Sequence, residues 1–87
     1  MEKLEKEILV LLIFAETFAS IRDEVSEKNA GIVADELKNM IVKSWVVPVK
    51  DNESESGFIF DSDNMNSFKY RITAAGIDAL EKVGFKR

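Results

Sequence analysis

Apolar residues recur at helical spacing in the first part of the chain, and this spacing predicts a helix over about residues 2–19. One apolar stripe along it consists of Ile8, Leu11, Leu12, Ala15, Phe18 and Ala19. Four more apolar residues lie off that stripe: Leu9, Val10, Ile13 and Phe14. The middle of the helix is therefore apolar nearly all round, and its second face needs a cover. We expect a homodimer partner to provide that cover, with burial inside the same domain as the alternative.

Two more helices are expected before residue 44. Residues 20–27 predict a short helix capped by Ser20, although the apolar spacing also permits one unbroken helix with the preceding segment. Residues 28–31 indicate a break. A third helix follows over about residues 30–43, and its buried face is expected to consist of Val33, Leu37, Met40 and Ile41.

The periodicity changes after residue 44. Residues 45–49 are rich in strand formers, and Pro48 favours an edge position because proline has no N–H to donate to a ladder. Residues 58–60 are a short strand candidate, and residues 68–72 alternate between apolar and charged side chains as a half-buried strand does. A last helix is expected over about residues 74–83.

Together these elements predict one α+β, mainly α domain over residues 1–87: a three-helix body, a β-hairpin and a C-terminal helix. Thr73 is suited to cap the last helix, and Gly84 stands where a helix commonly ends. Gly76, three residues into that helix, disfavours helical structure and so suggests that another backbone approaches closely there.

Five residues in this region carry a family resemblance: Tyr70, Ile72, Thr73, Gly76 and Leu80. Their spacing resembles the segment from the wing to the last helix in PadR-like and MarR-like winged-helix transcriptional regulators. Residues 34–46 resemble the end of the recognition helix of that family and its entry into the first wing strand, with Ser44 where the family usually has glycine. The resemblance implies a winged helix whose third helix enters the major groove of DNA.

By that resemblance, seven residues are candidates to contact DNA: Lys28, Asn29, Lys38, Asn39, Lys43, Lys69 and Arg71. An asparagine can recognise adenine and a lysine guanine or phosphate, and the two basic residues of the last strand can hold phosphates. Such a site predicts that Lys38, Asn39, Lys69 and Arg71 share one exposed face. The expected function is a small transcriptional regulator that binds DNA as a homodimer through Leu9, Val10, Ile13 and Phe14.

The charge distribution supports a second hypothesis. The chain has a net charge of −4, residues 29–43 carry two lysines and two acids, and residues 51–66 carry five acids and no base. An acidic wing tip is repelled by the phosphate backbone, so non-specific DNA affinity should be low. The alternative is a winged-helix protein-interaction module that offers the acidic loop 51–66 to a basic partner or imitates the charge of DNA.

Enzymatic and metal chemistry have little support. The chain contains no cysteine and no histidine, so thiolate ligands, disulfides and the commonest general base are absent. Residues 61–64 resemble the start of a calcium loop, but Met65 stands where a third oxygen ligand belongs. We expect no enzyme activity, metal or cofactor. The longest apolar run has eight residues, against about 20 for a membrane span, and no signal peptide pattern appears, so we expect a cytoplasmic protein.

Overall fold

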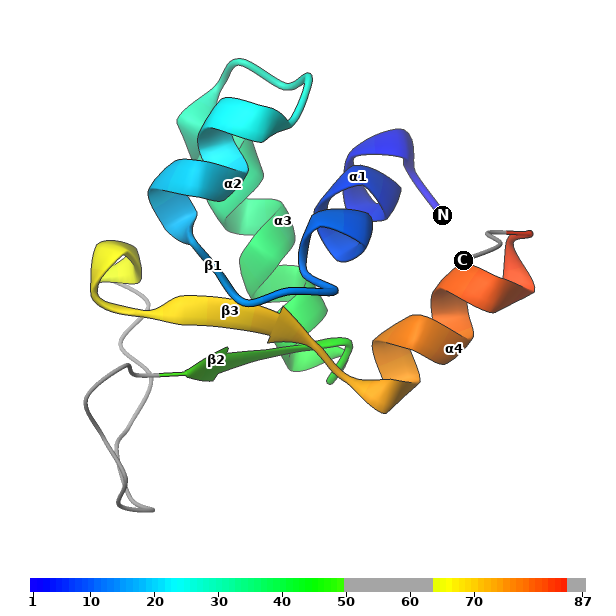
Figure 1. Ribbon diagram of the computed structural model, residues 1–87. Coiled ribbons are helices and arrows are strands. Elements are labelled where there is room, and N and C mark those ends of the chain that lie inside the picture. Colours follow the sequence, from blue (N-terminus) through cyan, green and yellow to red (C-terminus); the bar gives the residue numbers. More distant parts are fainter. Residues whose placement is uncertain (50–63, 85–87) are drawn as a thin grey trace.

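The computed structural model describes residues 1–49 and 64–84, which form a mostly helical α+β fold (Figure 1). This confirms the expected class, α+β and mainly α. In chain order the elements are α1 (Lys3–Leu11), β1 (Glu16–Thr17), α2 (Phe18–Glu24), α3 (Ala30–Val42), β2 (Val46–Val49), the 3-10 turn η1 (Met65–Ser67), β3 (Lys69–Ile72) and α4 (Ala74–Lys82). The expected strand at residues 58–60 and most of the acidic loop 51–66 lie outside the described residues.

The three strands form one antiparallel sheet in the order β1-β3-β2. In this register Val46 lies opposite Ile72, and Pro48 lies opposite Tyr70, which also faces Glu16 of β1. The expected strand around residues 68–72 therefore exists and is paired on both sides. Strand β2 is at an edge of the sheet, as its proline predicted.

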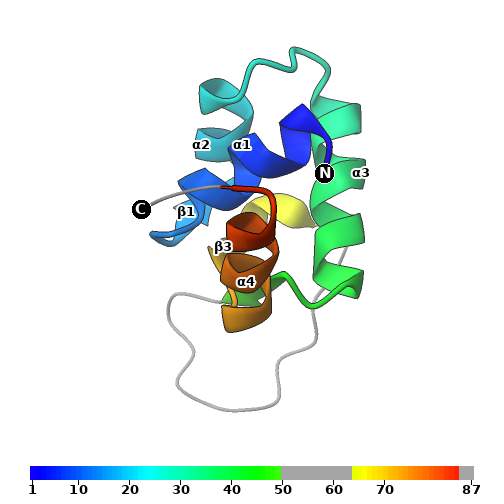
Figure 2. The same cartoon turned by 90° about the vertical axis from the view of Figure 1, so that its right-hand side faces the viewer.

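The core lies between the sheet and the three N-terminal helices. In Figure 1 helix α3 passes behind the sheet, and the quarter turn in Figure 2 shows α3 on one side of the molecule and the strands toward the other. Tyr70, Leu37 and Met40 are fully buried in this space. The Tyr70 hydroxyl donates a 2.8 Å hydrogen bond to the Met65 carbonyl, so η1 is fixed to β3 by a satisfied buried group.

The first helix is shorter than expected. It ends at Leu11 instead of residue 19, and a turn and strand β1 separate it from α2, which excludes one unbroken helix. The cap of α2 is Thr17 and not Ser20, because the Thr17 hydroxyl accepts a 3.1 Å hydrogen bond from the Ser20 N–H. Sheet pairing overrides local helix propensity here: the Leu12 carbonyl accepts from the Ile72 N–H at 2.8 Å, and the two residues of β1 pair with β3.

The shorter helix also changes which apolar residues are buried. Leu9 is fully buried in the core of the single chain, so its expected place in a dimer interface is wrong. Val10 is half-buried against the core. Ile13 and Phe14 lie in the turn after α1 and are 37% and 76% exposed, and of the expected stripe Leu11 is half-buried and Ala15 is exposed.

The junction of α3 with β2 is a tight turn that α4 holds in place. The Trp45 N–H donates to the Met40 carbonyl and the Ser44 N–H to the Ile41 carbonyl, which is the hydrogen-bond pattern of a Schellman motif. Ser44 occupies the left-handed position of that motif, with φ of 66°. Serine thus adopts the backbone conformation that glycine usually provides at this turn.

Thr73 connects this turn to the start of α4. Its hydroxyl accepts a 3.0 Å hydrogen bond from the Gly76 N–H and donates a 2.6 Å hydrogen bond to the Ser44 carbonyl. Its own N–H donates to the Trp45 carbonyl at 2.9 Å. Gly76 lies directly against this turn, since a Cβ there would overlap the Trp45 carbonyl oxygen. The cap and the close backbone approach expected from the sequence are both confirmed.

The left-handed Ser44 predicts that glycine is the better residue at this position. A non-glycine residue in this left-handed conformation destabilises the folded protein by about 1–2 kcal/mol. Glycine avoids that cost but loses more backbone entropy on folding, which destabilises the folded protein by about 0.5–1 kcal/mol. We expect Ser44→Gly to raise the free energy of unfolding by about 0.5–1 kcal/mol in urea denaturation. Ser44→Ala keeps the strained φ and should leave stability near that of the wild type; an equal gain from both variants would contradict this explanation.

Gly76→Ala tests the close approach of α4 to the turn. Alanine is the better helix former by about 1 kcal/mol, but its methyl group would meet the Trp45 carbonyl and, at 2.7 Å, Cγ1 of Ile72. We expect a net loss of about 1–3 kcal/mol in thermal or urea unfolding. Gly31→Ala is the matched control, because its added methyl group would meet only the rotatable Asn29 side chain, at 3.2 Å. A stabilising Gly76→Ala would show that α4 does not pack as described.

Candidate nucleic-acid interface

Helix α3 is the central element of the expected interface, and both its start and the loop before it are fixed by hydrogen bonds. The side-chain oxygen of Asn29 accepts from the Gly31 and Ile32 N–H groups at 2.9 and 3.3 Å. Ser26, two residues after the end of α2, donates its N–H and its hydroxyl to the Glu7 carboxylate at 3.0 Å. Asn29 therefore serves as the N-cap of α3, a role that leaves only its amide nitrogen for DNA.

The outward face of α3 is mixed in character. Val33, Leu37 and Met40 are buried, so the opposite face carries the exposed residues. These are Gly31, Ile32, Asp35, Asn39 and Val42. Val42 is 84% exposed and is the most exposed large hydrophobic residue of the described chain. Lys38 is half-buried beside this face, and Lys28 is exposed just before the helix.

Lys43 is already engaged within the protein. Its ammonium nitrogen lies 3.0 Å from Oε2 of Glu5 on α1 and 4.5 Å from the centre of the Trp45 ring. Glu5 is buried, so the ion pair also gives a positively charged partner to a carboxylate that is largely removed from water. Contact of Lys43 with a phosphate would have to compete with both interactions. Of the seven expected DNA contacts, Lys43 and Asn29 thus have structural roles that the sequence did not reveal.

A second carboxyl group adjoins this ion pair. Burial opposes ionisation of Glu5, but the Glu2 N–H, at 2.9 Å, and the Lys43 ammonium outweigh it and hold the Glu5 pKa below its ordinary value. Burial and the negative charge of Glu5 raise the pKa of Glu36 on α3. The contact between α1 and α3 therefore contains two carboxyl groups with opposite pKa shifts around one lysine.

The basic residues of β3 lie away from the outward face of α3. Arg71 is exposed and Lys69 is half-buried, while Tyr70 and Ile72 between and after them are buried. Because α3 and the sheet bury side chains in the same core, their outer faces point in opposite directions (Figure 2). The four residues Lys38, Asn39, Lys69 and Arg71 therefore do not share one face, contrary to the expectation.

Other kinds of site find no support in the described part of the chain. Within residues 1–49 and 64–84, no three histidine, cysteine, aspartate or glutamate side chains gather where they could hold a metal ion. None of the helices described is both long and apolar enough to cross a membrane. Comparison of the chain with protein-family models, with curated proteins and with solved structures gave no match.

Glu36→Gln tests the carboxyl pair. A raised pKa means that ionised Glu36 weakens the fold near neutral pH and that protonation removes the penalty. We expect the variant to be more stable than the wild type at pH 7, by about 0.2–1 kcal/mol, and the gain to fade as the pH falls through the raised pKa. Thermal unfolding across a pH series measures this.

Asp35→Asn is the control for the carboxyl pair, because it removes the same charge from the exposed face of the same helix. It should show no comparable gain. Glu5→Gln should have the opposite sign, since the lowered pKa means that ionised Glu5 stabilises the fold above its unfolded pKa and loses that effect as the pH falls through its folded pKa. If the effect of Glu36→Gln on stability did not depend on pH, the described interaction between the Glu5 and Glu36 carboxyl groups would be wrong.

Proposed function

We propose that the chain is a winged-helix domain that acts as a small DNA-binding transcriptional regulator. The observation that carries the proposal is the arrangement α1-β1-α2-α3-β2-β3-α4 with sheet order β1-β3-β2. In this arrangement, helices α2 and α3 are joined by a short loop and are followed by the antiparallel strands β2 and β3. One face of α3 does not pack on the core and is exposed to solvent. A helix of this kind fits the major groove.

The DNA-reading residues in this proposal lie on α3. Asn39 can donate and accept at an adenine edge, and Lys38 can reach guanine or a phosphate. Ile32 and Val42 offer apolar contact to thymine methyl groups. Binding would depend more on base contacts than on charge, because α3 has no surplus of positive charge. The proposed regulator is not an enzyme, forms a homodimer and is located in the cytoplasm.

The test is selection of bound sequences from a random duplex library at about 50 mM salt, where electrostatic binding is favoured. We expect one sequence motif to be enriched. Asn39→Ala should weaken binding to that motif by about 10- to 100-fold, which corresponds to the loss of one good base contact. Arg71→Ala is the matched control, because Arg71 is exposed on the far side of the core and should leave sequence preference unchanged.

A second candidate function is supported by the engagement of Lys43 with Glu5. This ion pair leaves the exposed surface of α3 with an acid, an amide and two apolar side chains, which also suits a protein partner. In that case the domain is a winged-helix interaction module that binds no DNA. The same selection separates the two functions: failure to enrich any motif would reject the regulator and leave the interaction module.

A further inference from the structure

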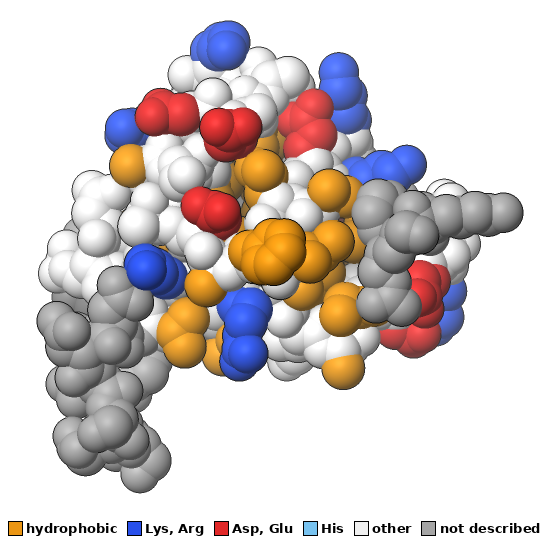
Figure 3. All heavy atoms as spheres, in the orientation of Figure 1, with side chains coloured by type: hydrophobic (Ala, Val, Ile, Leu, Met, Phe, Trp, Pro, Cys, Tyr) orange, Lys and Arg blue, Asp and Glu red, His pale blue; other side chains and the backbone are white. Residues whose placement is uncertain are grey.

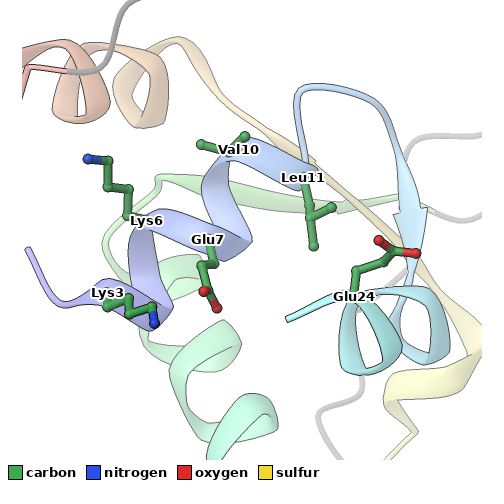
Figure 4. A pocket seen from close by; sticks show the side chains of 6 residues that line it. All are labelled: Lys3, Lys6, Glu7, Val10, Leu11 and Glu24. Atoms are coloured by element: carbon green, nitrogen blue, oxygen red, sulfur yellow. The ribbon is translucent and has the colours of Figure 1, made fainter. Parts of the chain in front are cut away.

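The solvent side of α1 forms a groove with α2 that the proposed DNA contacts do not use. Its volume is about 390 Å³, and it is lined by Lys3, Lys6, Glu7, Val10, Leu11 and Glu24 (Figure 4). Leu11 and Glu24 continue into a neighbouring hollow of about 280 Å³ that Glu16 and Ser20 complete. The floor is apolar, and the charged side chains lie around it.

The groove has a basic end and an acidic end. Figure 4 shows Lys3 and Lys6 on one side of Val10 and Leu11, and Glu24 on the other. Among the residues that the structure describes, Lys6 and Glu24 form no ion pair. Glu7 is held by Ser26, and the Ser26 hydrogen bonds together with the charge of Lys3 lower the pKa of Glu7. A ligand that complements this groove must therefore have an acidic end, an apolar middle and a basic end.

The chain itself offers such a ligand. Under a two-fold axis across the groove, the Lys6 end of one copy meets the Glu24 end of the other, and both copies gain the same contacts. Phe14 lies in the turn that follows α1, three residues after Leu11, and is 76% exposed. Figure 3, in the orientation of Figure 1, shows hydrophobic side chains gathered near the middle of this face of the molecule. An aromatic side chain exposed to this extent is a typical interface anchor.

We propose that this groove is the interface of a two-fold homodimer, in which Phe14 of each copy packs on the apolar floor formed by Val10 and Leu11 of the other. Lys6 then pairs with Glu24 across the axis. The core side of α1 carries Glu5, Ile8 and Leu9, so the interface uses the opposite side of the helix and leaves the outward face of α3 free. This inference rests on the homodimer of the proposed function but not on DNA binding.

Sedimentation equilibrium without DNA, over a concentration series to about 1 mM, gives the dimer dissociation constant. We expect Phe14→Ser to raise it at least about tenfold, as loss of an aromatic anchor does, and to leave the circular dichroism spectrum unchanged. Val42→Ser is the control, because it removes another highly exposed apolar side chain, 84% exposed, from α3. A monomeric wild type, or a dimer indifferent to Phe14→Ser, overturns the proposal.

Charge reversal tests the two-fold register. Lys6→Glu and Glu24→Lys should each weaken the dimer, because every copy then meets a like charge. A mixture of the two variants should form a heterodimer of near wild-type affinity, since both cross-axis pairs are restored. Failure of the mixture to associate overturns the arrangement. A dimer that passes these tests but enriches no DNA sequence would refute the regulator and keep this interface.

Discussion

The fold depends on one junction, where the turn after α3, the start of β2 and the first turn of α4 meet. Thr73 holds it with three hydrogen bonds: its hydroxyl donates to Ser44 and accepts from Gly76, and its N–H donates to the Trp45 carbonyl. The absent side chain of Gly76 lets the two backbones touch. Because this contact sets where β2 begins and where β3 ends, it also fixes the strand register and the direction of α3.

Local pattern was sufficient for this half of the fold. Alternation along residues 69–72, a threonine before the last helix and a glycine inside it each reflect a requirement of one element or of one contact between neighbours. The end of α1 could not be read in the same way. The eight-residue apolar run from Ile8 to Ala15 contains no helix breaker. Helix α1 ends within this run because β1 pairs with β3, which comes much later in the chain.

In the candidate site, too, some features follow from the local sequence pattern and others depend on contacts with distant parts of the chain. The exposed residues of α3, including Asn39, follow from helical periodicity once its buried face is known. The engagement of Lys43 does not, because Glu5 precedes it by 38 residues and belongs to another helix. The separation of Arg71 from α3 likewise depends on the layering of helix and sheet. Residue type and spacing thus identified the groups on each element but not which of them share a surface.

The position of Lys43 beside Trp45 also gives the protein an intrinsic fluorescence signal. Trp45 is the single tryptophan of the chain, and its ring lies 4.5 Å from an ammonium group that Glu5 holds in place. Indole emission responds to a nearby fixed charge, so the fluorescence of the unlabelled protein senses the contact between α1 and the end of α3. Binding of any ligand that separates Lys43 from Glu5 therefore changes the tryptophan fluorescence and can be measured without a dye.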